Sequence, residues 1–490
     1  FHKPIESDSW SNVSINGVLR GSYDGVYDLN DNEFGKDAQE NYLGENWHPG
    51  GNTAADILLS AGTPFPCEND PVKCKNLDGY MDEDESDAKF PEFNDRLDFL
   101  REFYITADKQ LDNGDIFNIT FGKQQVVWGK TDLFRVLDVI NPVDYSRHNI
   151  YDELEDIRIP QWMLTAEWRM GPNDVLDDSN LSFIWNIDKF RPNNLGTCGQ
   201  SYKIIDAGCF FSSSAAIAPV IHDVEEPNWS LDNTQFGVKW EGVYKDTTFS
   251  LNALHYRQQL PSLHFRANTA FNPMNPLAPG NFPFMDDGVF DIKFPRVTLL
   301  GGSIDYYSMD MDAVWRLEVA YTEGEEQPRD LNGHKETDML RYVIGFDKNL
   351  VIPSLGTSSA FLISTQLFGE HILDHEVDMP NDEDNWIATG LFKGWYKNNR
   401  LSPQIIVAHD FAAKATAIAP SVSWTPDNHW MFNVGLNVKV GGDEKFPWGA
   451  TGLVGQPGVP QYEPLARFTN GPIGVANQED EIQFTVRYSF

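Results

Sequence analysis

The residues of this chain that could do chemistry are few, and they do not form a catalytic set. No Gly-x-Ser-x-Gly nucleophile motif occurs, and the 11 histidines are scattered through the sequence. His371 and His375 stand four residues apart, but they lack the glutamate that accompanies such a pair in zinc enzymes. We therefore predict that the chain is not an enzyme and carries no catalytic metal.

The 4 cysteines fall into two local pairs. Cys67 lies close to Cys74, and Cys198 lies close to Cys209. Neither pair has the histidines or the second Cys-x-x-Cys that a zinc site requires. In an exported protein, oxidising conditions favour disulfide formation. The spacing predicts two disulfides, each of which closes a short loop.

The charge of the chain is strongly acidic, with 37 basic against 73 acidic residues and a net charge of −36. This balance argues against binding to nucleic acid, because the phosphate backbone attracts basic surfaces. Acidic residues concentrate at 82–87 and at 378–384. A solvated acidic surface explains these runs, and structural calcium is the alternative. Neither run has the glycine placement of a calcium loop, so we expect no cofactor.

The end of the chain alternates apolar and polar residues, from Ile482 to the terminal Phe490. This pattern is typical of the closing strand of a bacterial outer-membrane β-barrel, whose terminal aromatic residue we expect to engage the barrel-assembly machinery. No run of about 18 apolar residues occurs, which excludes a helical membrane protein. The chain starts at Phe1 rather than at methionine, which leads us to expect that a signal peptide has been removed.

Period-two segments recur along the chain, and we count about 16, an even number as single-chain barrels require. Short turns and long loops alternate between them, as expected for periplasmic and extracellular connections. The predicted long loops are 28–93, 129–160, 191–232, 260–294 and 441–480. We predict an all-β protein with one domain, residues 1–490, folded as a transmembrane antiparallel up-and-down β-barrel.

The two faces of each predicted strand differ in polarity. In 429–440, Trp430, Phe432 and Val434 share one side, whereas Asn433 and Lys439 share the other. An ionised group at the bilayer midplane costs about 2–4 kcal/mol, so the charged strand residues should point into the lumen. Each could line a solute path or brace the wall through an ion pair. These residues are Arg20, Asp24, Glu167, Arg169, Asp188, Lys239, Glu241, Arg316, Glu318, Arg341, Lys439 and Arg487.

The stretch 122–163 is too apolar for an ordinary surface loop, because it includes Leu137, Val139 and Ile140. We predict that 130–159 folds into the barrel mouth and narrows the pore, with a short helix near 132–138. Ion pairs from Arg135, Arg147 and Arg158 would fix it to inward-facing acidic groups. An external cap packed on neighbouring loops is the alternative.

The same stretch carries a resemblance to a known family. The run from Gly122 to Lys130, the run from Asp138 to Asp144 and the run from Leu154 to Met163 resemble an uncharacterised family of Gram-negative outer-membrane proteins, catalogued as a domain of unknown function. The chain is also distantly similar to alginate-export and porin barrels. The resemblance implies an outer-membrane location and an association with RND-type transporters of lipids or hydrophobic compounds. It implies no catalytic residues.

Taken together, the sequence favours a porin-like channel that passes small or hydrophobic solutes across the outer membrane. Outer-membrane lipids and lipopolysaccharide would be its surroundings, and a homotrimer is a further expectation by analogy with porins. One alternative is a structural or interaction barrel that displays the disulfide-closed acidic loops at the cell surface. Another is a sheath around a partner protein.

Overall fold

The structure is a computed structural model. It describes residues 1–30, 85–94, 96–131, 134–146, 154–194, 220–265, 289–329, 333–377, 379, 381–412, 414–441 and 480–488. Cys67, Cys74, Cys198, Cys209, Arg147 and Phe490 lie outside these residues, so the predicted disulfides and the role of the terminal phenylalanine stay predictions. Residues 82–84 of the acidic run 82–87 also lie outside them.

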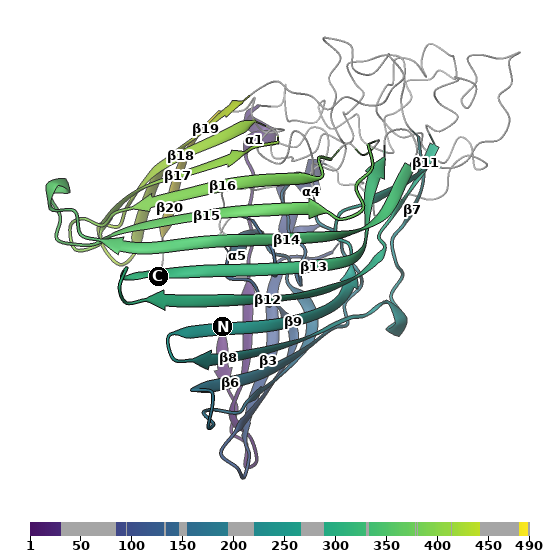
Figure 1. The fold of residues 1–490 in the computed structure, drawn as a ribbon, viewed down its shortest axis with the longest axis horizontal. Helices are drawn as coiled ribbons and strands as arrows, with labels where there is room; N and C mark the ends of the chain where they lie inside the picture. Colours follow the sequence, from purple (N-terminus) through teal and green to yellow (C-terminus); the bar gives the residue numbers. More distant parts are fainter. Residues whose placement is uncertain are drawn as a thin grey trace, which may run out of the picture.

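A sheet of 17 strands dominates the fold (Figure 1). Its strands are β1 (His2–Pro4), β2 (Ser11–Leu19), β3 (Leu100–Gln110), β4 (Ile116–Gln124), β5 (Gln161–Arg169), β6 (Asp178–Asn186), β8 (Gln235–Tyr244), β9 (Thr247–Arg257), β12 (Arg296–Ser308), β13 (Ala313–Arg329), β14 (Gly333–Leu350), β15 (Phe361–Ile372), β16 (Asp384–Lys393), β17 (Leu401–Asp410), β18 (Ala415–Trp424), β19 (Trp430–Gly441) and β20 (Glu481–Tyr488). The pairings that join them in chain order are antiparallel. Closure of this sheet into a barrel is not detected in the described parts of the chain.

A second, smaller sheet has 3 strands. It contains β7 (Val220–Glu225), β10 (Ser262–Phe265) and β11 (Val289–Lys293). β10 pairs antiparallel with β11, and β11 pairs parallel with β7. Because these strands leave the main series, β6 pairs directly with β8, and β9 pairs directly with β12.

The all-β class and the antiparallel arrangement are confirmed, whereas a count of 16 strands is not. Each predicted segment overlaps a strand of the main sheet, and β1 is additional. The intervals 191–232 and 260–294 are not simple loops, since they contain β7, β10 and β11. Sequence reasoning missed these strands because they are short and their partners lie far away in the chain.

The helical elements of the described residues are short. They are α1 (Val26–Leu29), α4 (Glu85–Lys89), α5 (Leu154–Ile157) and the 3-10 turns η2 (Pro91–Phe93), η3 (Leu231–Asn233) and η4 (Pro353–Leu355). Among the described residues, no helix combines the length and the apolar character needed to cross a membrane. The helix predicted near 132–138 is wrong over 134–138, which is irregular. Its backbone is held instead by a local turn, in which Val139 N donates to Leu137 O at 3.0 Å.

The cross-strand partners divide the main sheet into two faces. Arg169 lies across from Asn180, and Asn180 lies across from Glu241. Following such partners from strand to strand puts one set of charged residues on a single face, here called the inner face. The set is Glu167, Arg169, Lys239, Glu241, Arg316, Glu318, Arg341, Lys439 and Arg487.

The opposite, outer face carries large apolar side chains that are exposed. They extend over strands from β3 to β20 and include Phe103, Ile105, Phe121, Trp168, Phe183, Phe236, Leu251, Leu300, Ile304, Trp315, Ile344, Leu367, Trp430, Val434, Ile482 and Phe484. Scattered exposed apolar residues are normal on a soluble protein, but a continuous apolar face is not.

Candidate functional site

The candidate site is the chain between β4 and β5, residues 125–160, which we call the inner segment. Its described parts bury Trp128, Val136, Leu137 and Ile140 in the main hydrophobic cluster of the molecule. The remaining buried members come from the inner face of the sheet. They are Met163, Ile184, Leu254, Tyr256, Val297, Leu299, Ala320, Val343 and Phe368.

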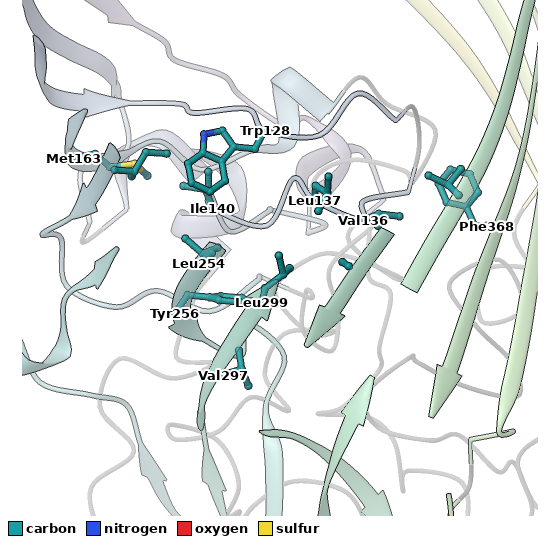
Figure 2. Packing of buried hydrophobic residues seen from close by; sticks show 13 residues of the cluster. Trp128, Val136, Leu137, Ile140, Met163, Leu254, Tyr256, Val297, Leu299 and Phe368 are labelled. Atoms are coloured by element: carbon teal, nitrogen blue, oxygen red, sulfur yellow. The ribbon is translucent and has the colours of Figure 1, made fainter. Parts of the chain in front are cut away.

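The main sheet curves around the inner segment. Figure 2 shows Trp128, Ile140 and Leu137 above Leu254 and Leu299, with Val136 next to Phe368. The inner face of the main sheet is called the wall below. The residues of the cluster that belong to it extend from β5 to β15. Neighbouring strands lie about 4.8 Å apart, so one short segment can contact this many strands only if the sheet bends around it.

Two glycines of the inner face admit the large side chains of the segment. A Cβ atom on Gly301 would lie 2.5 Å from Leu137 Cδ2, and one on Gly237 would lie 2.8 Å from Trp128 Cη2. A side chain at either position would therefore displace the segment or the strand. The wall and the segment fit each other at the level of single atoms, as in a protein core.

Asn141 holds the backbone of the inner segment together. Its side chain is fully buried, and its Oδ1 accepts a hydrogen bond from Val126 N at 2.8 Å. Its Nδ2 donates to Ile159 O at 2.9 Å. Two stretches of the segment are joined beside it, because Ile159 N donates to Pro142 O at 2.8 Å. Asn141 thus satisfies backbone groups of the irregular stretches of the segment, where no helix or strand pairs them.

A buried ion pair joins the two halves of the segment. Arg158 Nε donates to Asp138 Oδ2 at 2.7 Å, and the two side chains are only 8% and 2% exposed. Arg158 therefore does pair with an acidic group, as predicted, but the partner belongs to the segment itself. Arg135 makes different contacts from those predicted, since it donates to Asn141 O at 2.7 Å and to Gln259 Oε1 at 3.1 Å.

Polar contacts fasten the segment to the wall at Lys130. The backbone N of Lys130 donates to a carboxylate oxygen of the buried Glu318, and its Nζ pairs with Asp305. Its carbonyl oxygen accepts a hydrogen bond from Arg316 Nη1 at 2.6 Å. Arg316 also pairs with Asp347 at 2.7 Å. Two of the predicted inner-face charges, Glu318 and Arg316, thus bind the inner segment directly.

A cavity of about 290 Å³ lies between the segment and the sheet. Its apolar lining includes Leu299 and Phe368, and its charged lining includes Arg341, Glu325 and Glu370. Arg341 binds Glu325 through both Nη atoms, at 2.7 and 2.9 Å, and binds Glu370 at 2.6 Å. The cavity therefore offers an apolar wall beside a charged edge.

Several further predicted charges form pairs away from the segment. Arg169 lies 2.5 Å from Glu167, Lys239 lies 2.6 Å from Glu241, and Lys439 lies 3.8 Å from Glu481. Arg487 is exposed on the inner face of β20. These contacts fit the interpretation that the pairs brace the sheet.

Arg20 lies beyond the end of β2 rather than within a strand. Its Nε is 3.1 Å from a carboxylate oxygen of the buried Glu92, and its Nη1 donates to Asp156 O at 3.4 Å. Arg101, which the sequence did not single out, donates to the same carbonyl at 3.0 Å. The two arginines hold the carboxyl end of α5.

A second unpredicted contact ties the start of β3 to the chain after β6. Arg191 binds both carboxylate oxygens of Asp98, at 2.9 and 2.7 Å. Burial acts to raise the pKa of Asp98, but the hydrogen bonds and charge of Arg191 outweigh burial and hold this pKa well below its usual range. These residues carry no local sequence motif, and only their pairing in space reveals them.

Comparisons with known proteins support the family resemblance. A family model described as "Protein of unknown function (DUF1302)" matches residues 7–490. No curated protein matches the chain. Among solved structures, two mutants of the Rh. blastica porin are similar, each with a TM-score of 0.29 and 12% identity over 69% of this chain and 84% of the porin chain.

Proposed function

Since the chain belongs to the DUF1302 family, whose function is unknown, we propose that it is an outer-membrane channel protein whose inner segment narrows the passage. The observation that carries this proposal is the attachment of the inner segment to the inner face of the main sheet. An external cap would leave that face uncovered, whereas Trp128 and Leu137 are buried against it.

The outer face supports the membrane location. Phe103, Leu251, Leu300 and Phe484 are between 38% and 75% exposed on different strands of this face. Transfer of apolar surface out of water contributes about 25 cal/mol per Å², so lipid contact would stabilise such a face where water would not. Outer-membrane lipid and lipopolysaccharide are the partners that this surface fits.

The inner face is consistent with a passage whose wall is solvated in one part and covered by the inner segment in another. Charged pairs such as Arg169 with Glu167 lie on this face, where water can solvate them. The inner segment covers the part that extends from β5 to β15. A solute would therefore move between the segment and the uncovered wall.

The cavity beside the segment supports solutes that are part apolar and part charged. Leu299 and Phe368 suit a hydrocarbon group, and Arg341 with Glu325 and Glu370 suits a polar head. We include amphiphilic compounds in the proposal for this reason. An RND-type transporter and further copies of the chain are candidate partners, for which co-purification is the test.

The proposal predicts that loosening the segment opens the channel. Trp128→Ala with Leu137→Ala removes two of its buried anchors, whereas Leu251→Ala with Phe236→Ala shortens two exposed residues of the outer face. In planar bilayers, we expect the first pair of substitutions to raise the single-channel conductance above that of the wild type. The second pair should leave it unchanged.

Two results would overturn the proposal. If the wild type and the Trp128→Ala/Leu137→Ala variant are both silent in the bilayer while circular dichroism shows intact strands, the chain is not a channel. The alternative function, a barrel that displays loops at the cell surface, would then be favoured. If both variants conduct like the wild type, the segment does not narrow the passage.

A further inference from the structure

One group of side chains outside the inner segment has the composition of a metal site. It consists of His264, Glu326 and His334. One ligand atom from each residue lies within 4.8 Å of the others, and it is the only such group found among the described residues. His264 is 62 residues from Glu326 in the sequence, which explains why a search for closely spaced histidines did not reveal the group.

The three side chains come from two sheets. His264 lies on β10 of the small sheet, Glu326 on β13 and His334 on β14. Glu326 is paired across the strands with Glu336, and Pro328 is paired with His334, so Glu326 and His334 are diagonal neighbours on one face. β10 packs against both β13 and β14. The group therefore joins the small sheet to the main sheet.

The donor atoms of the three side chains lie close together. His264 Nε2 lies 2.6 Å from Glu326 Oε2, and His334 Nε2 lies 3.9 Å from Glu326 Oε1. The two imidazole rings are stacked, with centroids 3.5 Å apart. Ligand atoms of a tetrahedral zinc ion at about 2.0–2.1 Å stand about 3.3 Å from each other, so the two imidazole rings must turn out of their stacked arrangement to bring all three ligand atoms onto one ion.

The composition and exposure of the group fit a transition metal. Two imidazoles and one carboxylate are a known ligand set for zinc, whereas calcium and magnesium prefer oxygen ligands only. The side chains of His264, Glu326 and His334 are 21%, 12% and 30% exposed, so an ion can enter and keep a water molecule as its fourth ligand.

We propose that His264, Glu326 and His334 bind one divalent transition-metal ion of the zinc class, which fastens the small sheet to the extended ends of β13 and β14. This proposal is independent of the channel function, because none of the three residues belongs to the inner segment. The alternative is a hydrogen-bonded cluster of the same residues that binds no metal.

The test is titration of the full chain in detergent, after removal of metal with EDTA, with Co²⁺ and then Zn²⁺. We expect one equivalent to bind, with a visible cobalt spectrum of nitrogen and oxygen ligands. Removal of a direct ligand by His264→Ala or His334→Ala should weaken binding more than about 100-fold, beyond the 10- to 100-fold typical of outer-shell changes. Zinc should raise the Tm of the wild type and not that of these variants.

His371→Ala is the matched control, because His371 Nδ1 also contacts a carboxylate, that of Asp384 at 2.8 Å. It should bind metal like the wild type. X-ray absorption of the zinc-loaded wild type needs no variant and should show two imidazole ligands. Absence of binding by the folded wild type, equal binding by His264→Ala, or thiolate bands in the cobalt spectrum would each overturn the proposal.

Discussion

Two regions of the inner face have opposite character although they belong to the same sheet. Over β5 to β15, the inward residues Leu254, Leu299 and Phe368 are apolar and buried. On β17 to β20, the inward row Gln404, Ser421, Gly435 and Gln483 is polar or small and half-buried, whereas inward residues nearer the other end of these strands, such as Ala417, are buried. The first region lies under the inner segment, and the second is the wall that we propose to face the passage.

The difference shows that the polarity of an inward side chain depends on what it contacts, the inner segment or water, and not on its strand. Where the inner segment packs on the wall, apolar burial stabilises the contact. Buried charges there are paired, as Asp138 is with Arg158, or accept a backbone hydrogen bond, as Glu318 does from Lys130 N. Where water contacts the inner face, polar side chains such as serine and glutamine are stable without further partners. The predictions below test this division between a dry region and a wet region.

The largest expected effect is that of Arg158→Leu. This change leaves the carboxylate of Asp138, 2% exposed, without its partner, and breaking one half of a buried pair costs about 3–5 kcal/mol. Unfolding by urea in detergent should show a loss of this size. The double variant Arg158→Leu/Asp138→Leu removes both charges and should recover most of it. Equal losses in the two variants would contradict a dry environment.

Leu137→Ala should have the next largest effect. Leu137 is 1% exposed and lies in the cluster, so its truncation leaves a cavity and costs about 2–5 kcal/mol. Leu251→Ala is the control, because Leu251 is 57% exposed on the outer face and its truncation leaves no internal cavity. Thermal unfolding in detergent distinguishes the two. Similar losses would mean that the segment is not packed on the wall.

The sequence predicts much of this comparison but not its details. The alternation of Trp430, Phe432 and Val434 with Asn433 is enough to define β19 and its two faces, because the period of a strand is a local property. The burial of Val136, Leu137 and Ile140 follows from their apolar character. The contacts of Leu137 with Gly301 and of Arg101 with Asp156 do not, because they join segments far apart in the chain and carry no motif.

Ser421→Trp tests the wet region. Ser421 is half-buried on the inner face, and an indole there would occupy space in the proposed passage. Single-channel conductance in planar bilayers should fall relative to the wild type, with little change in stability, since substitutions at such sites usually stay within about 0.5 kcal/mol. Val422→Trp places the same side chain on the outer face and should leave conductance unchanged. A fall in both variants would point to a general defect.

The smallest expected effect is that of Arg169→Leu, which removes the same type of ion pair as Arg158→Leu, but at the solvent-exposed last residue of β5, away from the buried cluster. Arg169 and Glu167 are 49% and 27% exposed at a separation of 2.5 Å, so water solvates whichever partner remains. Solvated pairs contribute about 0–1 kcal/mol, and salt screens them. Urea unfolding at low and at high salt should therefore differ little between Arg169→Leu and the wild type. A loss as large as that of Arg158→Leu would mean that the inner face is dry along the whole of β5, out to Arg169, and the proposed passage would have to lie elsewhere.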